Sequence, residues 1–203
     1  QWQALDPSGN PIAEAPLAVL ATAYGVTIQT SLAWLPLTSI RGQTTHLPAT
    51  DQLSDLQVAL CDSGYLPPAR SGQHCMGASF VPGDPGTDER AAEHAHNVDM
   101  MRTALPDLNL NSPDAGWRGH VAHRCSSNDY LPVAGAVPDL PAFNTQYDAL
   151  RHDRKRPINA ACPVLPGLAV LTSLGSRGLS AAPLAAEVLA DQLCGGPPAV
   201  PRY

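Results

Sequence analysis

Several features are missing from this sequence of 203 residues, and each absence excludes a class of protein. No run of 18 or more apolar residues occurs, so no membrane-spanning helix is expected. The first residues lack the basic start, apolar core and cleavage site of a secretory signal, and no initiator Met is present, so we expect the chain to begin inside a longer protein. The five cysteines include no C-x-x-C pair, which is typical of a reducing compartment and predicts a cytoplasmic protein without a disulfide scaffold.

Positive charge is also scarce. Lys and Arg number 12 against 18 Asp and Glu, and the formal net charge of −6 excludes a chain that coats nucleic acid through bulk electrostatics. Any contact with RNA must therefore come from a local patch. One such patch is predicted within residues 151–156, where the basic residues are Arg151, Arg154, Lys155 and Arg156. A solvated loop is the alternative interpretation of this run.

The residues that are present support a sizeable core, because 44% are hydrophobic, and they allow one large domain or two small ones. Alternating apolar residues on both sides of Asp6–Asn10 predict a hairpin. The apolar run at 15–22 predicts a strand that is buried on both of its faces and lies at the edge of an α/β layer. Further strand-like segments, separated by Pro, Gly and Asp, predict an antiparallel meander and then a strand pair. The meander comprises 37–47, 57–66 and 73–81, and the pair comprises 119–125 and 130–137.

The clearest helix is predicted after Thr87, which is a favourable N-cap residue. Apolar residues recur at helical spacing over 91–105, and Pro106 ends the pattern. The helix contains His94 and His96, which lie two positions apart and so point to different faces. A shared metal site is therefore not expected there.

The last predicted unit is a strand at 168–174, a Gly-rich turn at 175–178 and a helix through residue 193. Pro183 is expected in the first turn of this helix, where its missing N–H removes no intrahelical bond. An irregular Pro-rich and Arg-rich stretch, 138–166, precedes the unit. The Gly-rich turn at 175–178, followed by a helix, would present unpaired N–H groups and the positive end of the helix dipole to an electron-rich group. An ordinary tight turn is the alternative, since Gly serves such turns widely.

Arg124 lies in a strand-like segment of the sequence. An inward-facing Arg is costly to bury without an anionic partner. The residue is therefore either half of a structural ion pair or a group that binds the carboxylate of a ligand, and the sequence leaves both interpretations open.

Three ordered segments resemble one enzyme family. Residues 35–43 resemble the strand that these enzymes carry beside the isoalloxazine, Arg124 with 129–135 resembles their substrate-carboxylate strand, and 174–187 resembles their closing flavin-binding turn and helix. The chain is thereby identified as similar to FAD-dependent amine oxidoreductases of the D-amino-acid/glycine-oxidase type. Further likenesses resemble the members that finish a modified wobble uridine in tRNA, and they lie at 41–48, 61–66 and 74–80.

The resemblance implies an α+β piece of an α/β flavoenzyme, with an antiparallel substrate-domain sheet, flanking helices and C-terminal remnants of the FAD-binding domain. Residues 1–36 would be partial FAD-binding strands, 37–137 the substrate domain, and 138–203 a linker and the closing flavin-binding unit. Arg124 would be the catalytic residue that binds substrate carboxylate. The implied cofactor-binding residues are Ala21, Thr22, Arg41, Gly42, Gln43, Gly175, Ser176, Arg177, Gly178 and Leu179. The implied tRNA-binding residues are Arg151, Arg154, Lys155 and Arg156.

For the intact enzyme, the resemblance implies oxidation of an N-substituted glycine, carboxymethylaminomethyl-(2-thio)uridine. Hydride leaves the carbon next to the amine, the imine hydrolyses, and glyoxylate leaves an aminomethyl-uridine. The implied cofactor is FAD, and the implied partners are tRNA and a methyltransferase domain of the same parent chain, without membrane or metal. These residues contain no G-x-G-x-x-G turn for the FAD pyrophosphate, so the isolated chain is expected to lack FAD and to be inactive.

Three other functions remain to be compared with this one. The first is a small-molecule amine oxidase acting on glycine, sarcosine or a D-amino acid, and the second is a non-catalytic domain that binds substrate or docks RNA. The third is a metal module, whose ligands would match no recognisable zinc spacing. Those ligands would be Cys61, His74, Cys75 and Cys125.

Overall fold

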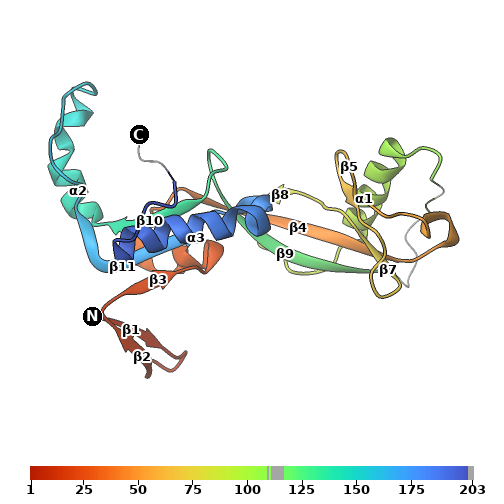
Figure 1. Ribbon diagram of the computed structural model, residues 1–203, viewed down its shortest axis with the longest axis horizontal. Coiled ribbons are helices and arrows are strands. Elements are labelled where there is room, and N and C mark those ends of the chain that lie inside the picture. Colours follow the sequence, from red (N-terminus) through yellow and green to blue (C-terminus); the bar gives the residue numbers. More distant parts are fainter. Residues whose placement is uncertain (109, 111–116, 201–203) are drawn as a thin grey trace. The chain divides into compact units, whose positions relative to one another are not determined.

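The computed structural model describes residues 1–108, 110 and 117–200, and it divides into two compact units (Figure 1). The first unit comprises Gln1–Leu37 and the chain from Ser126 onward, and the second comprises Thr38–Cys125. Sheets and helices occur in both, which confirms the predicted mixed fold class. Of the helices in the described ranges, none has the length and apolar character needed to cross a bilayer.

The first unit opens with the predicted hairpin, formed by β1 (Trp2–Leu5) and β2 (Pro11–Ala15). The Asp6 carboxylate accepts the backbone N–H groups of Ser8 and Asn10, both at 2.8 Å, which closes the turn. These hydrogen bonds hold the pKa of Asp6 below its usual range, with the Asn10 side chain as the largest cause.

The main sheet of the first unit has the order β10-β11-β3. β10 (Val133–Pro138) is antiparallel to β11 (Val164–Thr172), and β11 is parallel to β3 (Ala18–Leu20). The core beneath this sheet includes side chains of two short 3-10 helices, η1 (Ala23–Ile28) and η2 (Thr30–Leu32). Its buried members are Val26, Leu32, Leu35, Val137, Leu168 and Val170.

The strand predicted at 15–22 is shorter than expected and is not buried on both faces. Ala18 and Leu20 pack against the core, but Val19 remains 43% exposed. Side chains alternate along a strand, so Val19 points to the face opposite that core. A continuous apolar run was therefore a wrong guide to burial here.

The stretch at 138–166, predicted to be irregular because it is rich in Pro and Arg, contains a helix. α2 spans Leu140–Gln146 and is followed by η4 (Asp148–Arg151). Asp139 caps α2, since its side chain accepts the N–H of Ala142 at 3.2 Å, and Pro141 lies in the first turn, where it removes no bond.

The closing strand, turn and helix are confirmed. After β11, η5 (Gly175–Arg177) leads directly into α3 (Gly178–Cys194), which lies along β10 and β11 (Figure 1) and ends at Gly195 with a φ of 69°. The position expected for Pro183 was wrong. Because α3 already begins at Gly178, Pro183 falls in the second turn, where its missing N–H leaves one intrahelical hydrogen bond unmade.

The second unit is built on one long strand, β4 (Leu37–Pro48). It pairs antiparallel with β7 (Gln73–Met76) and β8 (Val81–Pro82), and it also pairs with β9 (Arg118–Ser127). The second strand of the predicted meander is a small hairpin of β5 (Leu60–Cys61) and β6 (Tyr65–Leu66). A single turn, η3 (Asp51–Leu53), follows β4.

The strand pair predicted at 119–125 and 130–137 does not form. β9 pairs with β4 in the second unit, whereas β10 pairs with β11 in the first. The two compact units meet between Cys125 and Ser126, and the domain bounds expected at 36 and 137 stay a prediction. Local turn signals show where a strand ends, but they do not identify its partner.

Helix α1 (Ala91–Ala104) begins later than predicted. Its N-cap position is Arg90, not Thr87, because the Gln43 side chain accepts the Arg90 N–H at 2.8 Å and so caps the helix from the neighbouring strand. Ala91 is exposed, and the first buried residues of α1 are polar. They are Glu93, His94 and Asn97, and they precede the apolar Val98 and Met101, which join a core that includes Leu47, Leu66 and Met76.

Candidate functional site

Strand β4 presents two different faces because its side chains alternate. Arg41, Gln43 and Thr45 are fully buried on the side of α1, where Asn97 donates to the Gln43 carbonyl at 2.9 Å and to the Thr45 hydroxyl at 3.0 Å. Gly42 and the other even positions point to the opposite side. We call that side of the sheet the open face, and it carries Gly42, Thr44 and His46 of β4 and Arg118, His120, Ala122 and Arg124 of β9.

The buried face holds a polar network around Arg41. The guanidinium of Arg41 pairs with the Glu93 carboxylate and donates through Nε to the Gly86 carbonyl at 3.0 Å. Ser79 joins the network, since its hydroxyl donates to Glu93 and accepts the Gln43 N–H at 2.8 Å. A buried charge of this kind requires such partners, so the network ties α1 to the sheet.

This arrangement changes the roles available to Arg41 and Gln43, for which cofactor binding was expected. The Gln43 amide donates to the Arg90 carbonyl at 2.9 Å and accepts the Arg90 N–H, so its side chain is occupied in capping α1. Arg41 is occupied by Glu93. The backbone of Gln43 is also engaged, since its N–H donates to the Ser79 hydroxyl at 2.8 Å and its carbonyl accepts from Asn97 at 2.9 Å. Gly42, between these two residues, is the one of the three that faces the open face.

The guanidinium of Arg124 lies on the backbone of Gly42. A Cβ added to Gly42 would be 2.0 Å from Nη1 and 2.7 Å from Cζ of Arg124. Nη1 also donates to the Ser79 carbonyl at 3.4 Å. The Arg124 side chain is half-buried, and in the described ranges no Asp or Glu forms an ion pair with it. The sequence left open whether Arg124 forms a structural ion pair, and no carboxylate of the described residues forms one with it.

Tyr65 lies near the same guanidinium. Burial raises the pKa of its phenol, the Cys75 thiol raises it further, and the positive charge of Arg124 lowers it in part. Its hydroxyl oxygen would be 3.5 Å from a Cβ on Gly77, which places it beside Thr44. Tyr65 thus stays a neutral hydrogen-bonding group at the open face.

The implied flavin residues of the first unit gather at one edge of its sheet. β3 and β11 are parallel, with Val170 opposite Leu20, so their carboxyl ends meet at the same edge. Ala21 and Thr22 follow β3 there, and the turn 175–178 follows β11. The Thr172 hydroxyl donates to the Ala23 carbonyl at 2.9 Å and joins the two ends. In open α/β sheets, ligands bind outside the carboxyl ends of the strands.

The turn at this edge presents backbone N–H groups, of which that of Arg177 donates to the Leu174 carbonyl at 3.2 Å. Gly175 has a φ of 56°, a left-handed conformation that favours glycine, and no side chain caps the start of α3. Ser176, Arg177 and Leu179 are exposed, and Leu179 is 101% exposed. Backbone N–H groups, a helix N-terminus and a cation fit the side of a flavin ring that gains negative charge on reduction. The donors therefore fit the ring part of FAD.

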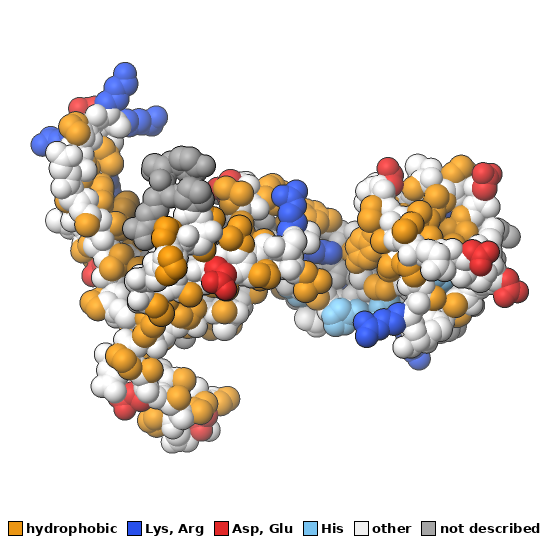
Figure 2. Space-filling view, in the orientation of Figure 1, with side chains coloured by type: hydrophobic (Ala, Val, Ile, Leu, Met, Phe, Trp, Pro, Cys, Tyr) orange, Lys and Arg blue, Asp and Glu red, His pale blue; other side chains and the backbone are white. Residues whose placement is uncertain are grey.

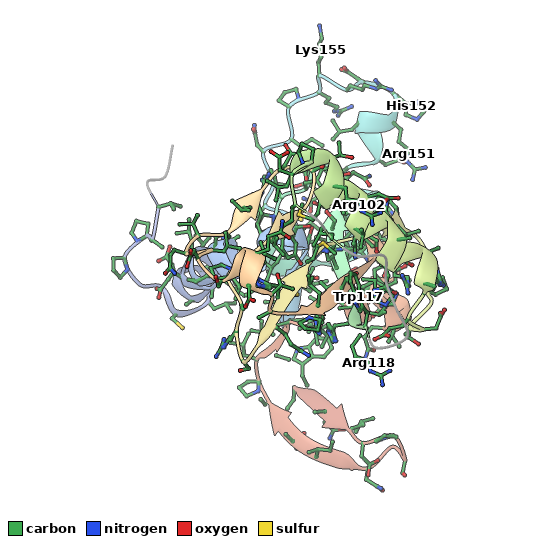
Figure 3. All side chains as sticks on the ribbon, turned by 90° about the vertical axis from the view of Figure 1, so that its right-hand side faces the viewer. Arg102, Trp117, Arg118, Arg151, His152 and Lys155 are labelled. Atoms are coloured by element: carbon green, nitrogen blue, oxygen red, sulfur yellow. The ribbon has the colours of Figure 1, made fainter. Side chains whose placement is uncertain are left out.

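The basic run lies on the exposed segment after η4. Arg151 is 3.5 Å from Asp148, a surface ion pair that leaves it 68% exposed. The Asp153 carboxylate accepts the Lys155 N–H at 3.0 Å. Figure 2 shows basic side chains gathered at the end of this segment, and Figure 3 shows Arg151 and Lys155 extending outward. Arg154 and Arg156 are also exposed, so the four cations are accessible to phosphate groups.

Residues 1–192 match the model of a protein family described as FAD dependent oxidoreductase. This chain belongs to that family. The resemblance to this family, drawn from the sequence motifs, is therefore confirmed. The cofactor of the family is FAD, and the turn at 175–178 fits the ring of that cofactor.

Two relatives of this chain carry the same name, tRNA 5-methylaminomethyl-2-thiouridine biosynthesis bifunctional protein MnmC. The protein of Pseudomonas aeruginosa (strain UCBPP-PA14) is 42% identical over 196 residues, which cover 94% of this chain and 30% of the relative. The protein of Pseudomonas entomophila (strain L48) is 42% identical over 207 residues, which cover 100% of this chain and 32% of the relative. The chain thus spans about a third of the length of the curated relatives it matches.

Two solved structures share the fold. Iminodiacetate oxidase from Chelativorans sp. BNC1 aligns with a TM-score of 0.68 at 20% identity, over 97% of this chain and 47% of that one. Glycine oxidase from Geobacillus kaustophilus aligns with a TM-score of 0.67 at 18% identity, over 96% and 45%. At these identities the likeness shows the fold alone.

Sequence reasoning missed the partners of the implied site, above all Glu93 and Ser79. Polar residues at 93, 94 and 97 recur at helical spacing and could have indicated a polar buried face of α1.

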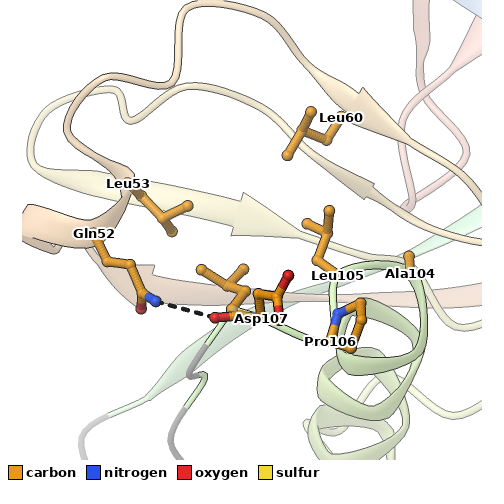
Figure 4. Close-up of a pocket in the computed structure, with 8 residues that line it drawn as sticks. Gln52, Leu53, Leu60, Ala104, Leu105, Pro106 and Asp107 are labelled. Atoms are coloured by element: carbon orange, nitrogen blue, oxygen red, sulfur yellow. Dashed lines mark hydrogen bonds between the residues drawn. The ribbon is translucent and has the colours of Figure 1, made fainter.

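The described residues contain no group of three His, Cys, Asp or Glu side chains suited to a metal. A cavity of about 450 Å³ in the second unit is mainly apolar and contains no predicted site residue (Figure 4). Its lining includes Leu53, Leu60, Leu105 and Leu108.

Proposed function

We propose that the intact protein carrying this chain is an FAD-dependent amine oxidoreductase that removes the carboxymethyl group from carboxymethylaminomethyl-(2-thio)uridine at the wobble position of tRNA. The observation that carries the proposal is the guanidinium of Arg124, which lies on the open face without a carboxylate partner among the described side chains. The name of the relatives, which match 94% to 100% of this chain, supports tRNA as the substrate.

Arg124 supplies position in this reaction. Its planar guanidinium binds the carboxylate of the glycine-like arm through two parallel hydrogen bonds, while Gly42 and the Ser79 carbonyl fix the guanidinium from behind. The carbon between the carboxylate and the amine is thereby held in one orientation. Lys cannot reproduce the geometry, because an ammonium is a single point charge.

The oxidation converts the C–N bond of the arm to C=N with loss of one hydride and one proton. FAD, when bound, would accept the hydride. Water then adds to the C=N bond, and its cleavage gives glyoxylate and an aminomethyl group on the uridine. The backbone donors at 175–178 and the Arg177 cation would hold the ring of the cofactor and stabilise its added negative charge.

The basic run has a separate part in the proposal. We propose that Arg151, Arg154, Lys155 and Arg156 bind tRNA phosphates, because they are exposed and locally reverse the negative charge of the chain. A methyltransferase domain of the same parent chain would be the second activity of a bifunctional protein, as the name of the relatives suggests.

The test is Arg124→Lys in the intact protein loaded with FAD, with glyoxylate release from modified tRNA as the assay. Loss of a charge-assisted pair of about 1.5–3 kcal/mol should lower kcat/KM about 10- to 150-fold. Flavin content and Tm should stay unchanged, and Arg102→Lys on α1 is the matched control. A lowered Tm with normal kinetic constants would show that Arg124 is structural, and faster turnover of sarcosine than of tRNA would favour the small-molecule oxidase.

A further inference from the structure

We propose that the open face of the second unit continues the substrate site beyond Arg124 and binds the phosphate backbone of the nucleotide that is modified. The binding groups are Arg118, His120 and His46. This inference rests on the proposed function, because it assigns the rest of the same substrate to the same face. The phosphate that these residues bind is that of the modified nucleotide, whereas the basic run at 151–156 binds other phosphates of the tRNA.

The alternation of β9 places Arg118 and His120 on the open face. A Cβ on Gly119 would be 2.9 Å from the His94 ring and 3.5 Å from the Gln43 side chain, so position 119 points toward α1. His123, four residues on, also points away from the open face, and its Nε2 contacts the Asp84 carbonyl at 3.1 Å. The even positions therefore share the face on which Arg124 lies.

Thr44 brings the two histidine positions together. Its hydroxyl lies 3.3 Å from Nε2 of His46 and 3.4 Å from the backbone carbonyl of His120. Arg118 and His120 are exposed, and Figure 3 shows the Arg118 side chain extending away from its strand. The imidazoles, one hydroxyl and one guanidinium thus form a polar surface beside the proposed carboxylate site.

The charge of this surface selects an anion. The chain as a whole has a net charge of −6, but none of the open-face positions of β4, β7 and β9 is acidic. Two acidic side chains lie close to these strands. Glu93 of α1 pairs with Arg41 on the buried side, and Glu89, which precedes α1, lies 3.9 Å from His94 and accepts the Gly119 N–H at 2.7 Å. Within the described residues, the open-face strand positions themselves carry no carboxylate, so a phosphate that approaches them meets Arg118, Arg124 and neutral polar groups. The open-face positions are 42, 44, 46, 73, 75, 118, 120, 122 and 124.

The spacing along β9 fits a nucleotide attached to the bound carboxylate. The Arg124 guanidinium lies on Gly42, two residues from Thr44, whose hydroxyl contacts the His120 carbonyl. Because strands rise about 3.3 Å per residue, His120 lies about 7 Å and Arg118 about 13 Å along the strands from the guanidinium. A 5-carboxymethylaminomethyl arm, the base and the ribose separate the carboxylate from the phosphate of the same nucleotide by on the order of 10 Å, given bonds of about 1.5 Å along a bent path. A phosphate at that separation would lie between His120 and Arg118, within reach of both side chains.

The experiment uses the intact, FAD-loaded protein with Arg118→Gln and His120→Gln, and two measurements. The first is the affinity for unmodified tRNA as a function of salt, which requires no catalysis. We expect Arg118→Gln to weaken binding about two- to fivefold and to lower the salt slope by up to about one unit. The second is the ratio of KM for modified tRNA to KM for the free modified nucleoside, which carries no phosphate, and we expect this ratio to rise in both variants.

Arg102→Gln is the matched control, since this exposed cation lies on α1, which covers the opposite side of the sheet. It should leave the salt slope and the KM ratio unchanged. An unaltered salt slope in Arg118→Gln, or an equal rise of both KM values in the two variants, would overturn the phosphate site. A wild-type protein that binds tRNA with the expected slope but oxidises neither substrate would contradict the proposed reaction and leave the phosphate contacts supported.

Discussion

Replacing Gly42 with Ala should separate the fold of the second unit from the position of Arg124. The added Cβ would be 2.0 Å from Nη1, 2.7 Å from Cζ and 2.8 Å from Nη2 of Arg124. Heavy atoms do not approach this closely, so the guanidinium must move. It is the end of a flexible side chain, whereas β4 is held by its neighbours, and the side chain will therefore move first.

The size of the effect follows from what the displacement removes. The guanidinium would lose its support on Gly42 and its 3.4 Å contact with the Ser79 carbonyl, and with them the orientation needed for two parallel hydrogen bonds to a carboxylate. A lost charge-assisted interaction is worth about 1.5–3 kcal/mol, or about 10- to 150-fold in kcat/KM. The free energy of unfolding should change by less than about 1 kcal/mol, because no packed backbone atom is displaced.

The assay is glyoxylate release from the modified substrate by the intact, FAD-loaded protein, with Tm measured in parallel. Gly196→Ala is the control, since the nearest atom to its added Cβ is Asp191 Oδ1 at 3.9 Å. The double variant Gly42→Ala with Arg124→Lys should be little worse than Arg124→Lys alone, because both changes act on one interaction. Additive losses, or normal kcat/KM in a correctly folded Gly42→Ala protein, would refute the reasoning.

Three further predictions concern stability. Glu93→Gln leaves the buried Arg41 guanidinium without its counter-charge and should cost about 3 kcal/mol in denaturant unfolding, and a change below about 1 kcal/mol would contradict the importance of the pair. Hydrogen bonds from the Arg90 side chain, then from Gly86, lower the pKa of Asp84 from 3.8 to about 2, so its stabilisation is complete above pH 4 and is lost as pH falls through about 2. Asp84→Asn should flatten the pH dependence of unfolding over that window, and parallel slopes would exclude this role. Gly167→Ala should destabilise by about 2 kcal/mol or more in thermal unfolding, because φ is 71° and the Cβ would be 2.1 Å from the Pro16 carbonyl oxygen.

The sequence predicted local structure better than pairing. Dense turn signals located the hairpin at Asp6–Asn10 and the turn at 175–178, because Gly and Asn tolerate backbone conformations that other residues avoid. Pairing depends on contacts distant in sequence, and so β10 was assigned to the wrong sheet. The start of α1 was missed for the same reason, since its cap is Gln43, a residue 47 positions away.

The site could be predicted as a set of segments but not as a set of roles. In the motif Arg41-Gly42-Gln43, the resemblance to flavoenzymes marks all three residues equally. Period-two alternation then divides them, because the charged and amide side chains face α1 and the glycine faces the ligand side. Which side α1 covers depends on Glu93 and Asn97, more than 50 residues later, so the division cannot be read from the motif itself.

This division gives the two faces of β4 opposite requirements. On the α1 side, Arg41 is held by its ion pair with Glu93 and by hydrogen bonds to the carbonyls of Gly86 and Asp88, and substitution there should act through stability. On the open face, the described residues give Arg124 one long contact to a carbonyl and a glycine beneath it, which leaves other donors of the guanidinium for a ligand. A guanidinium that is positioned by backbone but not neutralised by a carboxylate is suited to exchange its solvent for a substrate anion. Neutralising it internally, by a carboxylate introduced at position 44 on the same face, should therefore abolish carboxylate binding while sparing the fold, and retention of normal KM would show that Arg124 does not bind the substrate.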